Sequence, residues 1–314
     1  MVRKVLRCAV KIFFLAGALS LTACAQNGND TTPTTPAPAP SEEEAQSATP
    51  PSIPPMPVDN TPNWLAPDDL ENPDNLAVLE GPLAYKLQTP TRMLQLEPLT
   101  PGEELAILHT NKGDITIRFF PEDAPIAVTN FKALARNGYY DGLIFHRVIP
   151  GFMIQGGCPL GTGTGGESVW GGRFGTEVSF NLRHFRGALA MAHAGPGTIG
   201  SQFYIVQNDS LDPSFVPMFE DIKEHLDEAI HILPDGTRIY VRDIHPPEGI
   251  EYFLQNGGTP HLDWFWNQRG PHPVFAHVVD GMDVVDAIAN TPQGANNRPI
   301  DDMIIERISF IIHE

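Results

Sequence analysis

Basic residues are scarce in this chain of 314 residues. Lysine and arginine together number 20 against 38 aspartates and glutamates, which gives a formal net charge of −18 at pH 7. Proteins contact the phosphate backbone of nucleic acids mainly through lysine and arginine, and anionic lipid headgroups attract basic segments. The charge therefore argues against nucleic acid as a partner. It also argues against binding of the folded part to a membrane surface through its own residues.

Long hydrophobic runs are also missing. The apolar run Val10–Leu21 holds about a dozen residues with a lysine inside it, whereas a spanning helix needs about 20 residues. Basic residues and no acids precede this run, a pattern typical of a signal peptide. The run ends in Leu21-Thr22-Ala23-Cys24, which resembles the bacterial lipoprotein signal.

This resemblance implies that residues 1–23 are a signal peptide and that Cys24 is lipidated. The protein would then be exported and anchored to the cell membrane, facing its extracytoplasmic side. Ordinary secretory cleavage nearby, with Cys24 incidental, is the alternative.

Cysteine is nearly absent. Of the three cysteines, Cys8 lies in the expected signal peptide and Cys24 is the expected lipidation site, which leaves Cys158 in the body of the protein. A single thiol cannot close an intramolecular disulfide, so the fold must depend on its apolar core. Cys158 is expected to be a small buried or loop residue rather than a reactive thiol.

Proline and polar residues set off a leader from a globular part. Residues 24–62 repeat threonine, proline, alanine and glutamate with little to bury, which predicts a disordered tether. Residues 63–104 carry apolar side chains such as Trp64 and Tyr85, but prolines interrupt every run. We interpret them as an irregular arm lying on a domain that occupies residues 105–314.

Short strand-like runs dominate the sequence from residue 105 onward. Asp123 is predicted to cap a helix that has Pro125 in its first turn and ends at Asn137-Gly138, and a second helix is predicted over 282–290. Many short strands with two helices far apart predict a mainly β fold, a barrel capped at its ends. The predicted strands are 105–110, 114–120, 144–149, 152–155, 188–192, 203–207, 274–279 and 303–312.

Residues 209–258 interrupt this pattern. Phe219, Ile222, Leu226 and Ile230 share one helical face while acidic residues cover the other, and the turn sequence Pro234-Asp235-Gly236 follows. We expect a folded insertion with a solvated acidic face, because a structureless connection of this length is improbable.

An arginine interrupts an apolar run at residues 144–157. Taken by itself, the run predicts two short strands joined at Pro150-Gly151, with side chains alternating between faces. A charge inside such a run is costly unless it lines a cleft and is hydrogen-bonded. Arg147 could thus be a functional cation or merely form a salt bridge across the barrel, and the pattern alone leaves both open.

Two blocks of sequence indicate a family. The run Phe145-His146-Arg147-Val148-Ile149-Pro150-Gly151-Phe152-Met153-Ile154-Gln155-Gly156-Gly157 resembles the signature of the cyclophilins, which are peptidyl-prolyl cis/trans isomerases. A second block, Met191–Tyr204, resembles that family's other active-site segment, and the similarity covers about 105–208 and 259–312. The resemblance implies a closed eight-stranded barrel with a groove on its outside. It also implies a monomer that needs no cofactor or metal, binds proline-containing polypeptides and serves as a folding helper for exported proteins.

The resemblance also assigns residues. Arg147 is implied to be the catalytic arginine, and Phe152, Met153, Leu262 and Tyr204 to form the pocket for the substrate's proline ring. The full set of implied binding residues is Phe152, Met153, Gln155, Ala192, His193, Gln202, Tyr204, His261, Leu262 and His272.

Some positions depart from the family pattern. His261 stands where many relatives have the tryptophan associated with tight cyclosporin binding, so we predict weak inhibition. His193 replaces the usual asparagine. Tyr204 replaces the usual phenylalanine, and its hydroxyl could trim the pocket or point to solvent. The aromatic cluster Trp264–Trp266 is expected to pack against the insertion, with extension of the groove as the alternative.

Other functions are less well supported by the sequence. The glycine-rich segment 161–166 lacks the lysine of a phosphate-binding loop and is interpreted as a flexible loop beside the groove. The histidines show no zinc-site spacing. A non-catalytic surface binding or scaffold module built on the same fold is the main alternative, and isomerase turnover would separate the two.

Overall fold

The computed structural model describes residues 91–195, 197–232, 238–263, 267 and 270–314. The expected signal peptide, Cys24, the tether and most of the arm lie outside these residues, as does the cluster Trp264–Trp266. Within the described ranges, no helix is both long enough and apolar enough to span a bilayer.

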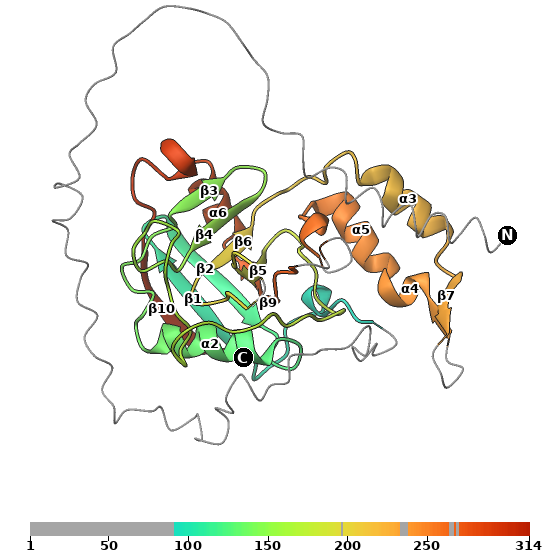
Figure 1. Cartoon of the computed structure of the whole chain (residues 1–314), viewed down its shortest axis with the longest axis horizontal. Coiled ribbons are helices and arrows are strands. Elements are labelled where there is room, and N and C mark those ends of the chain that lie inside the picture. The colour runs from blue at the N-terminus through green and yellow to red at the C-terminus, as the bar shows by residue number, and fades with distance from the viewer. Residues whose placement is uncertain (1–90, 196, 233–237, 264–266, 268–269) are drawn as a thin grey trace, which may run out of the picture. The chain divides into compact units, whose positions relative to one another are not determined.

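Eight strands form one antiparallel sheet in the order β10-β1-β2-β9-β5-β6-β4-β3 (Figure 1). The prediction of a mainly β fold with eight principal strands is confirmed. Strands far apart in sequence lie side by side, with β10 against β1 and β9 between β2 and β5. The strands are β1 Glu104–Thr110, β2 Gly113–Phe119, β3 Arg147–Ile149, β4 Met153–Gly156, β5 Ala188–Met191, β6 Phe203–Val206, β9 Val274–Asp280 and β10 Ile305–Ile312.

The segments that lead into the two edge strands are hydrogen-bonded to each other. Ile144, just before β3, forms an isolated antiparallel bridge with Ile304, just before β10. Phe145 donates its backbone N–H to the carbonyl of Met303 at 2.8 Å. The strand was predicted to begin at residue 144. It begins at Arg147, because the residues just before it pair with the segment that leads into β10.

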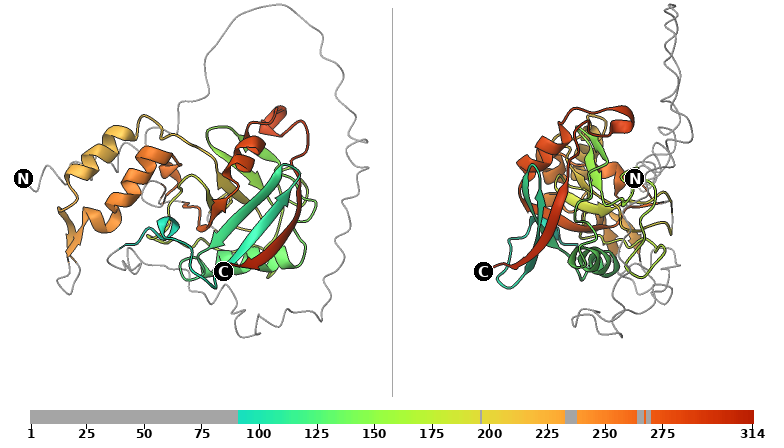
Figure 2. Two further views of the ribbon diagram at one scale, coloured as in Figure 1. Left: turned by 180° about the vertical axis from the view of Figure 1, so that it is seen from behind. Right: turned by 90° about the vertical axis from the view of Figure 1, so that its left-hand side faces the viewer.

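The core lies on one face of the curved sheet and is covered by two helices, α2 (Pro125–Arg136) and α6 (Met282–Ala289). Phe131 of α2 lies 5.2 Å, centroid to centroid, from both Phe203 and Phe275, and 5.0 Å from Tyr140. Figure 2 shows α2 across one end of the strands in two further views. Aromatic packing of this kind adds to the apolar area that the strands bury.

The prediction that Asp123 caps α2 is wrong. The residue at the cap is Ala124, which makes no side-chain hydrogen bond to the helix. Asp123 instead accepts hydrogen bonds from the side chains of Ser179 and Asn181. The first N–H groups of the helix are bound by the carboxylate of Glu177, which comes from a distant segment that the local pattern could not identify.

The insertion is folded, with helices α3 (Val216–Glu224), α4 (Val241–Ile244) and α5 (Pro247–Asn256) and a two-stranded sheet of β7 (Ala229–Ile232) and β8 (Arg238–Tyr240). Helices α3 and α5 lie side by side (Figure 1). The predicted helical face extended to Ile230, but α3 ends at Glu224 and Ile230 belongs to β7. The turn 234–236 lies outside the described residues.

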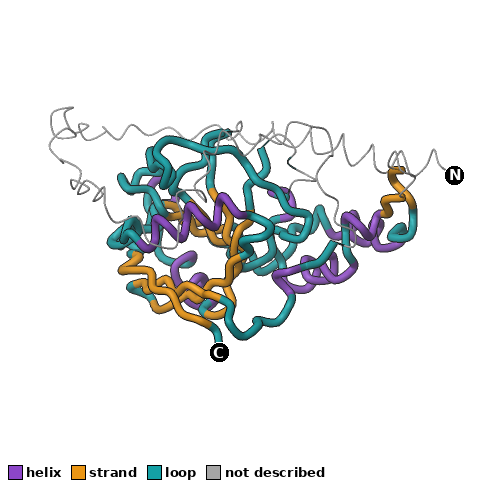
Figure 3. The backbone as a smooth tube through the Cα atoms, turned by 90° about the horizontal axis from the view of Figure 1, so that it is seen from below, coloured by secondary structure: helices purple, strands orange, loops and turns teal. Residues whose placement is uncertain are grey.

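A second apolar cluster joins this insertion to the segment before β5. Phe219 of α3 and Phe253 of α5 stack at 5.4 Å, and Phe253 also contacts Phe185, which lies in the loop before β5. Met93, next to the short helix η1 (Leu94–Leu96), packs into the same cluster. A Cβ on Gly249 would lie only 2.9 Å from the Met93 sulfur, so α5 packs closely against this side chain. The long segment between β4 and β5 contains no helix or strand, and loops of this kind are drawn in teal in Figure 3.

Candidate active site

Strands β4, β5 and β6 carry apolar side chains on both faces. Ile154 and Phe203 point into the core, while their neighbours Met153 and Tyr204 point to the opposite face. There they form an outer apolar cluster, because a second layer of side chains covers this part of the sheet. Its members are Phe120, Met153, Leu182, Ala188, Ala190, Tyr204, Val206 and Val274, with Leu94, Ile149, Phe152, Ala192 and Leu262 packed at its edge.

A chain of polar side chains runs beside this cluster. Arg147 is directly opposite Gln155 in the β3–β4 pair, and its guanidinium donates to the Gln155 Oε1 at 3.4 Å. The Gln155 amide donates in turn to Gln202 at 3.0 Å. Within the described part of the chain Arg147 forms no ion pair, so the interpretation as a cross-barrel salt bridge finds no support there.

A cleft of about 290 Å³ adjoins the two glutamines. The glycine-rich loop forms one wall, and the Gln202 amide donates to the carbonyls of Gly163 and Gly165 at 2.9 and 3.0 Å. The loop therefore lies beside the groove, as predicted. Cys158 is buried, also as predicted, with its sulfur 3.0 Å from the Thr164 carbonyl. The cleft is lined by Gln155, Gly163, Thr164, Gly165, Arg173, Ala192, His193, Ala194, Thr198, Gly200, Ser201 and Gln202.

Two histidines stack at the rim. The rings of His193 and His272 lie 4.1 Å apart at an interplanar angle of 21°. The backbone N–H of Gly195 donates to His193 Nδ1, so His193 Nε2 carries the proton and donates to the Pro271 carbonyl. Burial, together with the nearby His193 and His184, lowers the pKa of His272 to about 3. His272 is therefore uncharged at neutral pH.

The position of Tyr204 differs from both expectations for its hydroxyl. The hydroxyl neither trims the pocket nor points to solvent, because it is hydrogen-bonded to Nε2 of the buried His184 at 2.9 Å. The ring itself stays in the outer apolar cluster. His261, the position of the missing tryptophan, stacks on Phe152 with centroids 5.9 Å apart and also lies 6.4 Å from Phe215 of the insertion.

The residues that the resemblance assigned thus come together on one side of the sheet. They form an apolar floor flanked by a guanidinium and two amides, together with three histidines at the rim. Such a site can hold an apolar ring and donate a hydrogen bond to a weakly basic atom above it. Among the described residues, no three His, Cys, Asp or Glu side chains lie where they could share a metal ion.

Two residues close to the site were not predicted to act there. Neither His184 nor Asp263 was singled out from the sequence, yet His184 is bonded to Asp263 through Nδ1 and to Tyr204 through Nε2. The available signal was weak. His184 follows Arg183 and the pair lies between the apolar residues Leu182 and Phe185.

Comparison with known proteins identifies the same family as the two sequence blocks at residues 145–157 and 191–204. The family described as cyclophilin type peptidyl-prolyl cis-trans isomerase/CLD matches residues 105–233 and 243–310. A Staphylococcus aureus protein provisionally named as a peptidyl-prolyl cis-trans isomerase is 44% identical over 207 residues, which cover 66% of this chain and 91% of that protein. A Staphylococcus haemolyticus protein with the same name is 45% identical over 202 residues, covering 64% and 88%. A crystal structure of a Cryptosporidium parvum cyclophilin is 30% identical, covers 68% of this chain and 98% of its own, and aligns with a TM-score of 0.47.

Proposed function

The chain belongs to the cyclophilin-type peptidyl-prolyl cis-trans isomerase family, and from this premise we propose that Arg147 is its catalytic residue and that exported polypeptides are its substrates. The family match spans most of the globular part, and the enzyme is accordingly an isomerase of prolyl peptide bonds. The assignment of individual residues goes further than the family and is supported by their arrangement at the groove.

The reaction needs no nucleophile. Rotation about a peptide bond faces a barrier of about 18–20 kcal/mol because the C–N bond has partial double-bond character. At the twisted state the conjugation is lost, and the proline nitrogen becomes pyramidal and able to accept a hydrogen bond. Arg147 is always charged, and it can donate to this nitrogen only as the bond twists, so it stabilises the transition state more than the ground state.

The neighbours of Arg147 supply orientation. The Gln155 carbonyl oxygen holds one edge of the guanidinium, which limits the directions in which the remaining N–H groups can point. Phe152, Met153 and Leu262 lie in or at the edge of the outer apolar cluster, and we assign the binding of the proline ring to them. The protein would hold the proline ring of the substrate and leave the carbonyl before it free to rotate. This is a positioning effect, and it requires no chemical step by the protein.

The observation that carries this proposal is a hydrogen-bonded arginine beside an apolar floor on the outside of the sheet. Arg147→Ala should lower kcat/KM roughly 100-fold, as removal of a transition-state donor typically does, in a protease-coupled assay with a proline peptide. Arg307→Ala, on strand β10 that carries no site residue, is the matched control and should leave activity unchanged. Near-normal turnover by a folded Arg147→Ala protein would refute the assignment.

The proposed location, anchored to the cell membrane on its extracytoplasmic side, rests on the sequence alone. A basic segment, a short apolar run and Leu21-Thr22-Ala23-Cys24 support export and lipidation at Cys24. In the native host, Cys24→Ala should move the protein from the membrane fraction to the soluble fraction and abolish labelling by a fatty-acid analogue. If the variant stays in the membrane fraction, the anchor is not Cys24. If labelling is absent in the unmodified protein as well, ordinary secretory cleavage is the correct alternative.

We also propose that the sheet closes into a monomeric barrel, with α2 and α6 covering its ends. The Ile144–Ile304 bridge and the hydrogen bond from Phe145 to Met303 support closure between the two edges. The amide of Phe145 should then exchange with solvent as slowly as core amides in hydrogen-exchange NMR. Fast exchange at this amide, with slow exchange in β1 and β2, would indicate an open sheet.

A further inference from the structure

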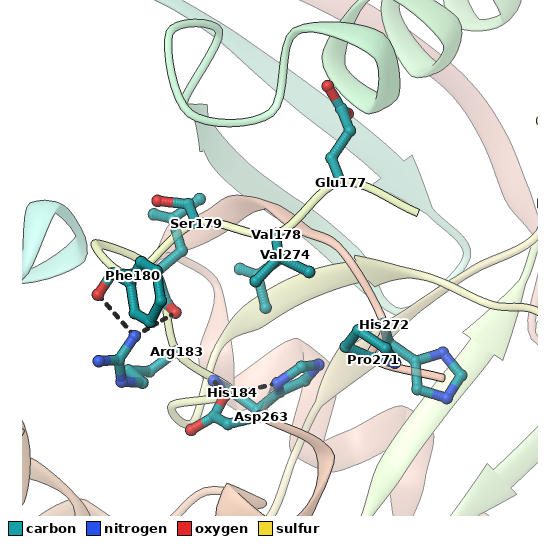
Figure 4. A pocket seen from close by; sticks show the side chains of 11 residues that line it. Glu177, Val178, Ser179, Phe180, Arg183, His184, Asp263, Pro271, His272 and Val274 are labelled. Carbon is teal, nitrogen blue, oxygen red and sulfur yellow. Dashed lines mark hydrogen bonds and ion pairs between the residues drawn. The ribbon is translucent and has the colours of Figure 1, made fainter. Parts of the chain in front are cut away.

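Three buried polar side chains lie directly behind the ring pocket. His184, Tyr204 and Asp263 are only 2%, 4% and 5% exposed. His184 Nδ1 is 2.7 Å from Asp263 Oδ1, and His184 Nε2 is 2.9 Å from the Tyr204 hydroxyl. Figure 4 shows the His184 and Asp263 side chains facing each other at a small cavity beside His272. Polar groups this deeply buried are costly unless each has a partner.

The direction of each hydrogen bond in this chain can be assigned. Asp263 Oδ1 also accepts the backbone N–H of His184 at 2.8 Å, so the carboxylate is the acceptor and His184 Nδ1 the donor. A neutral imidazole protonated at Nδ1 has only a lone pair at Nε2. In this form of His184, Tyr204 donates its O–H to Nε2. The hydroxyl is therefore fully engaged away from the substrate side.

His184 is also the anchor of the segment that carries Leu262. The carbonyl of His184 accepts the backbone N–H of Thr259 at 2.8 Å, while its side chain and backbone N–H bind Asp263. Between these two attachments lies the single-turn helix η2 (Pro260–Leu262). Leu262, at the edge of the ring pocket, is thus held at both ends of its turn by one residue of the barrel.

We propose that His184 is a positioning residue of the isomerase: through Asp263 it fixes Leu262 over the ring pocket, and through its Nε2 it keeps the Tyr204 hydroxyl out of that pocket. This inference deepens the proposed function and rests on it. Tyr204 and His184 form a functional pair. The buried hydroxyl of a tyrosine at position 204 requires a hydrogen-bond acceptor away from the substrate, whereas a phenylalanine has no hydroxyl and requires none.

Two substitutions separate the two bonds. An asparagine side chain places its amide nitrogen near the position of histidine Nδ1, so His184→Asn keeps the donor to Asp263 and loses the acceptor for Tyr204. A glutamine side chain reaches as far as Nε2, so His184→Gln keeps a partner for Tyr204 and loses the side-chain donor to Asp263. His109 provides matched controls, because its Nδ1 is 2.8 Å from Asp114 and its Nε2 is 2.8 Å from Ser309 on strands that carry no pocket residue.

The measurement is NMR titration of the full chain with an Ala-Ala-Pro-Phe peptide, together with the cis/trans exchange rate of the bound peptide. Only signals of folded protein are followed, so that loss of stability does not register as loss of affinity. His184→Asn should weaken binding roughly tenfold, which corresponds to one buried hydroxyl left without a partner. Adding Tyr204→Phe to His184→Asn should restore the affinity to within about twofold.

The glutamine series should behave differently. His184→Gln should also weaken binding, but Tyr204→Phe should not rescue it, because the defect is the loosened segment of Leu262. His109→Asn and His109→Gln should bind the peptide with unchanged affinity. Rescue that fails in the asparagine background, or normal affinity in folded His184→Gln, would overturn the proposal and show that His184 has only a structural role.

Failure of the proposed function is distinguished by the exchange rate. If Arg147→Ala exchanges the bound peptide at the normal rate, the catalytic assignment is wrong, whatever the His184 variants do to affinity. If Arg147→Ala abolishes exchange while the His184 series shows no change, the isomerase assignment stands and only the positioning role of His184 is lost.

Discussion

Glu177 makes the stability of this fold depend on pH near neutrality. Its two carboxylate oxygens accept the backbone N–H groups of Ile126 and Ala127, at 2.9 and 2.8 Å, at the start of α2. Burial raises the pKa of Glu177 from 4.5 to about 7, and the two backbone donors offset this only in part. The perturbation we consider is Glu177→Gln, which keeps the size and one acceptor oxygen but removes the charge.

The direction in which stability changes with pH follows from the linkage between proton binding and folding. The folded state holds the proton of Glu177 more tightly than the unfolded state, so stability is greatest below pH 4.5 and falls as the pH rises toward 7. A change of pKa from 4.5 to about 7 corresponds to a loss of about 3 kcal/mol, most of which falls between pH 5 and pH 8. Glu177→Gln removes this loss. The amide nitrogen of glutamine is a donor, so it cannot accept the N–H group that the second carboxylate oxygen accepts. The variant therefore also loses some stability at every pH.

The assay is urea unfolding of both proteins at pH 5 and pH 8. The free energy of unfolding of the unmodified protein, minus that of Glu177→Gln, should be smaller at pH 8 than at pH 5 by about 2–3 kcal/mol. Glu104→Gln is the control. Burial of Glu104 acts to raise its pKa, but Lys132 and Arg136 together lower it, so its contribution is lost only in acid and should stay constant between pH 5 and pH 8. Equal differences at both pH values for Glu177→Gln would refute the reasoning.

Three further outcomes are expected. Met153→Ala should lower the free energy of unfolding by about 2–5 kcal/mol and weaken peptide binding, because Met153 is 2% exposed in the outer apolar cluster; denaturant titration would show it. Gln95→Ala should cost about 1–3 kcal/mol in the same assay, since Gln95 bonds both backbone groups of Arg183 and the ring of His277. Cyclosporin should inhibit turnover only weakly because His261 replaces tryptophan, and nanomolar potency would contradict this.

Local pattern was sufficient where an element depends on its own residues. The strand β1 and the helix α6 lie within one or two residues of their predicted ranges, because alternation and helical spacing state directly which face is buried. The failures occurred where the partner is distant in sequence. Asp123 is a good cap in isolation, but the folded chain brings Ser179 and Asn181 to it and Glu177 to the helix.

Helix α5 shows a different limit. Its start at two successive prolines is a recognisable signal, and Ile250 and Phe253 lie on its buried face. This helix was nevertheless not predicted. Its packing partners are distant in sequence, because Ile250 and Phe253 share an apolar cluster with Met93 of the arm. Residue 93 lies more than 150 positions away, and no local pattern contains it.

The sequence by itself determined the family and the groove residues that lie within its two blocks. Arg147 and Gln155 are eight residues apart, and a tight β-hairpin places them opposite each other in the β3–β4 pair, so their meeting is a local consequence of chain geometry. Only the tertiary structure decided where the Tyr204 hydroxyl goes. Tyr204, its acceptor His184 and the carboxylate of Asp263 come from three separate segments, and packing, not spacing, brings them within hydrogen-bond distance. A buried hydroxyl must find a partner somewhere, and only the folded chain specifies which one.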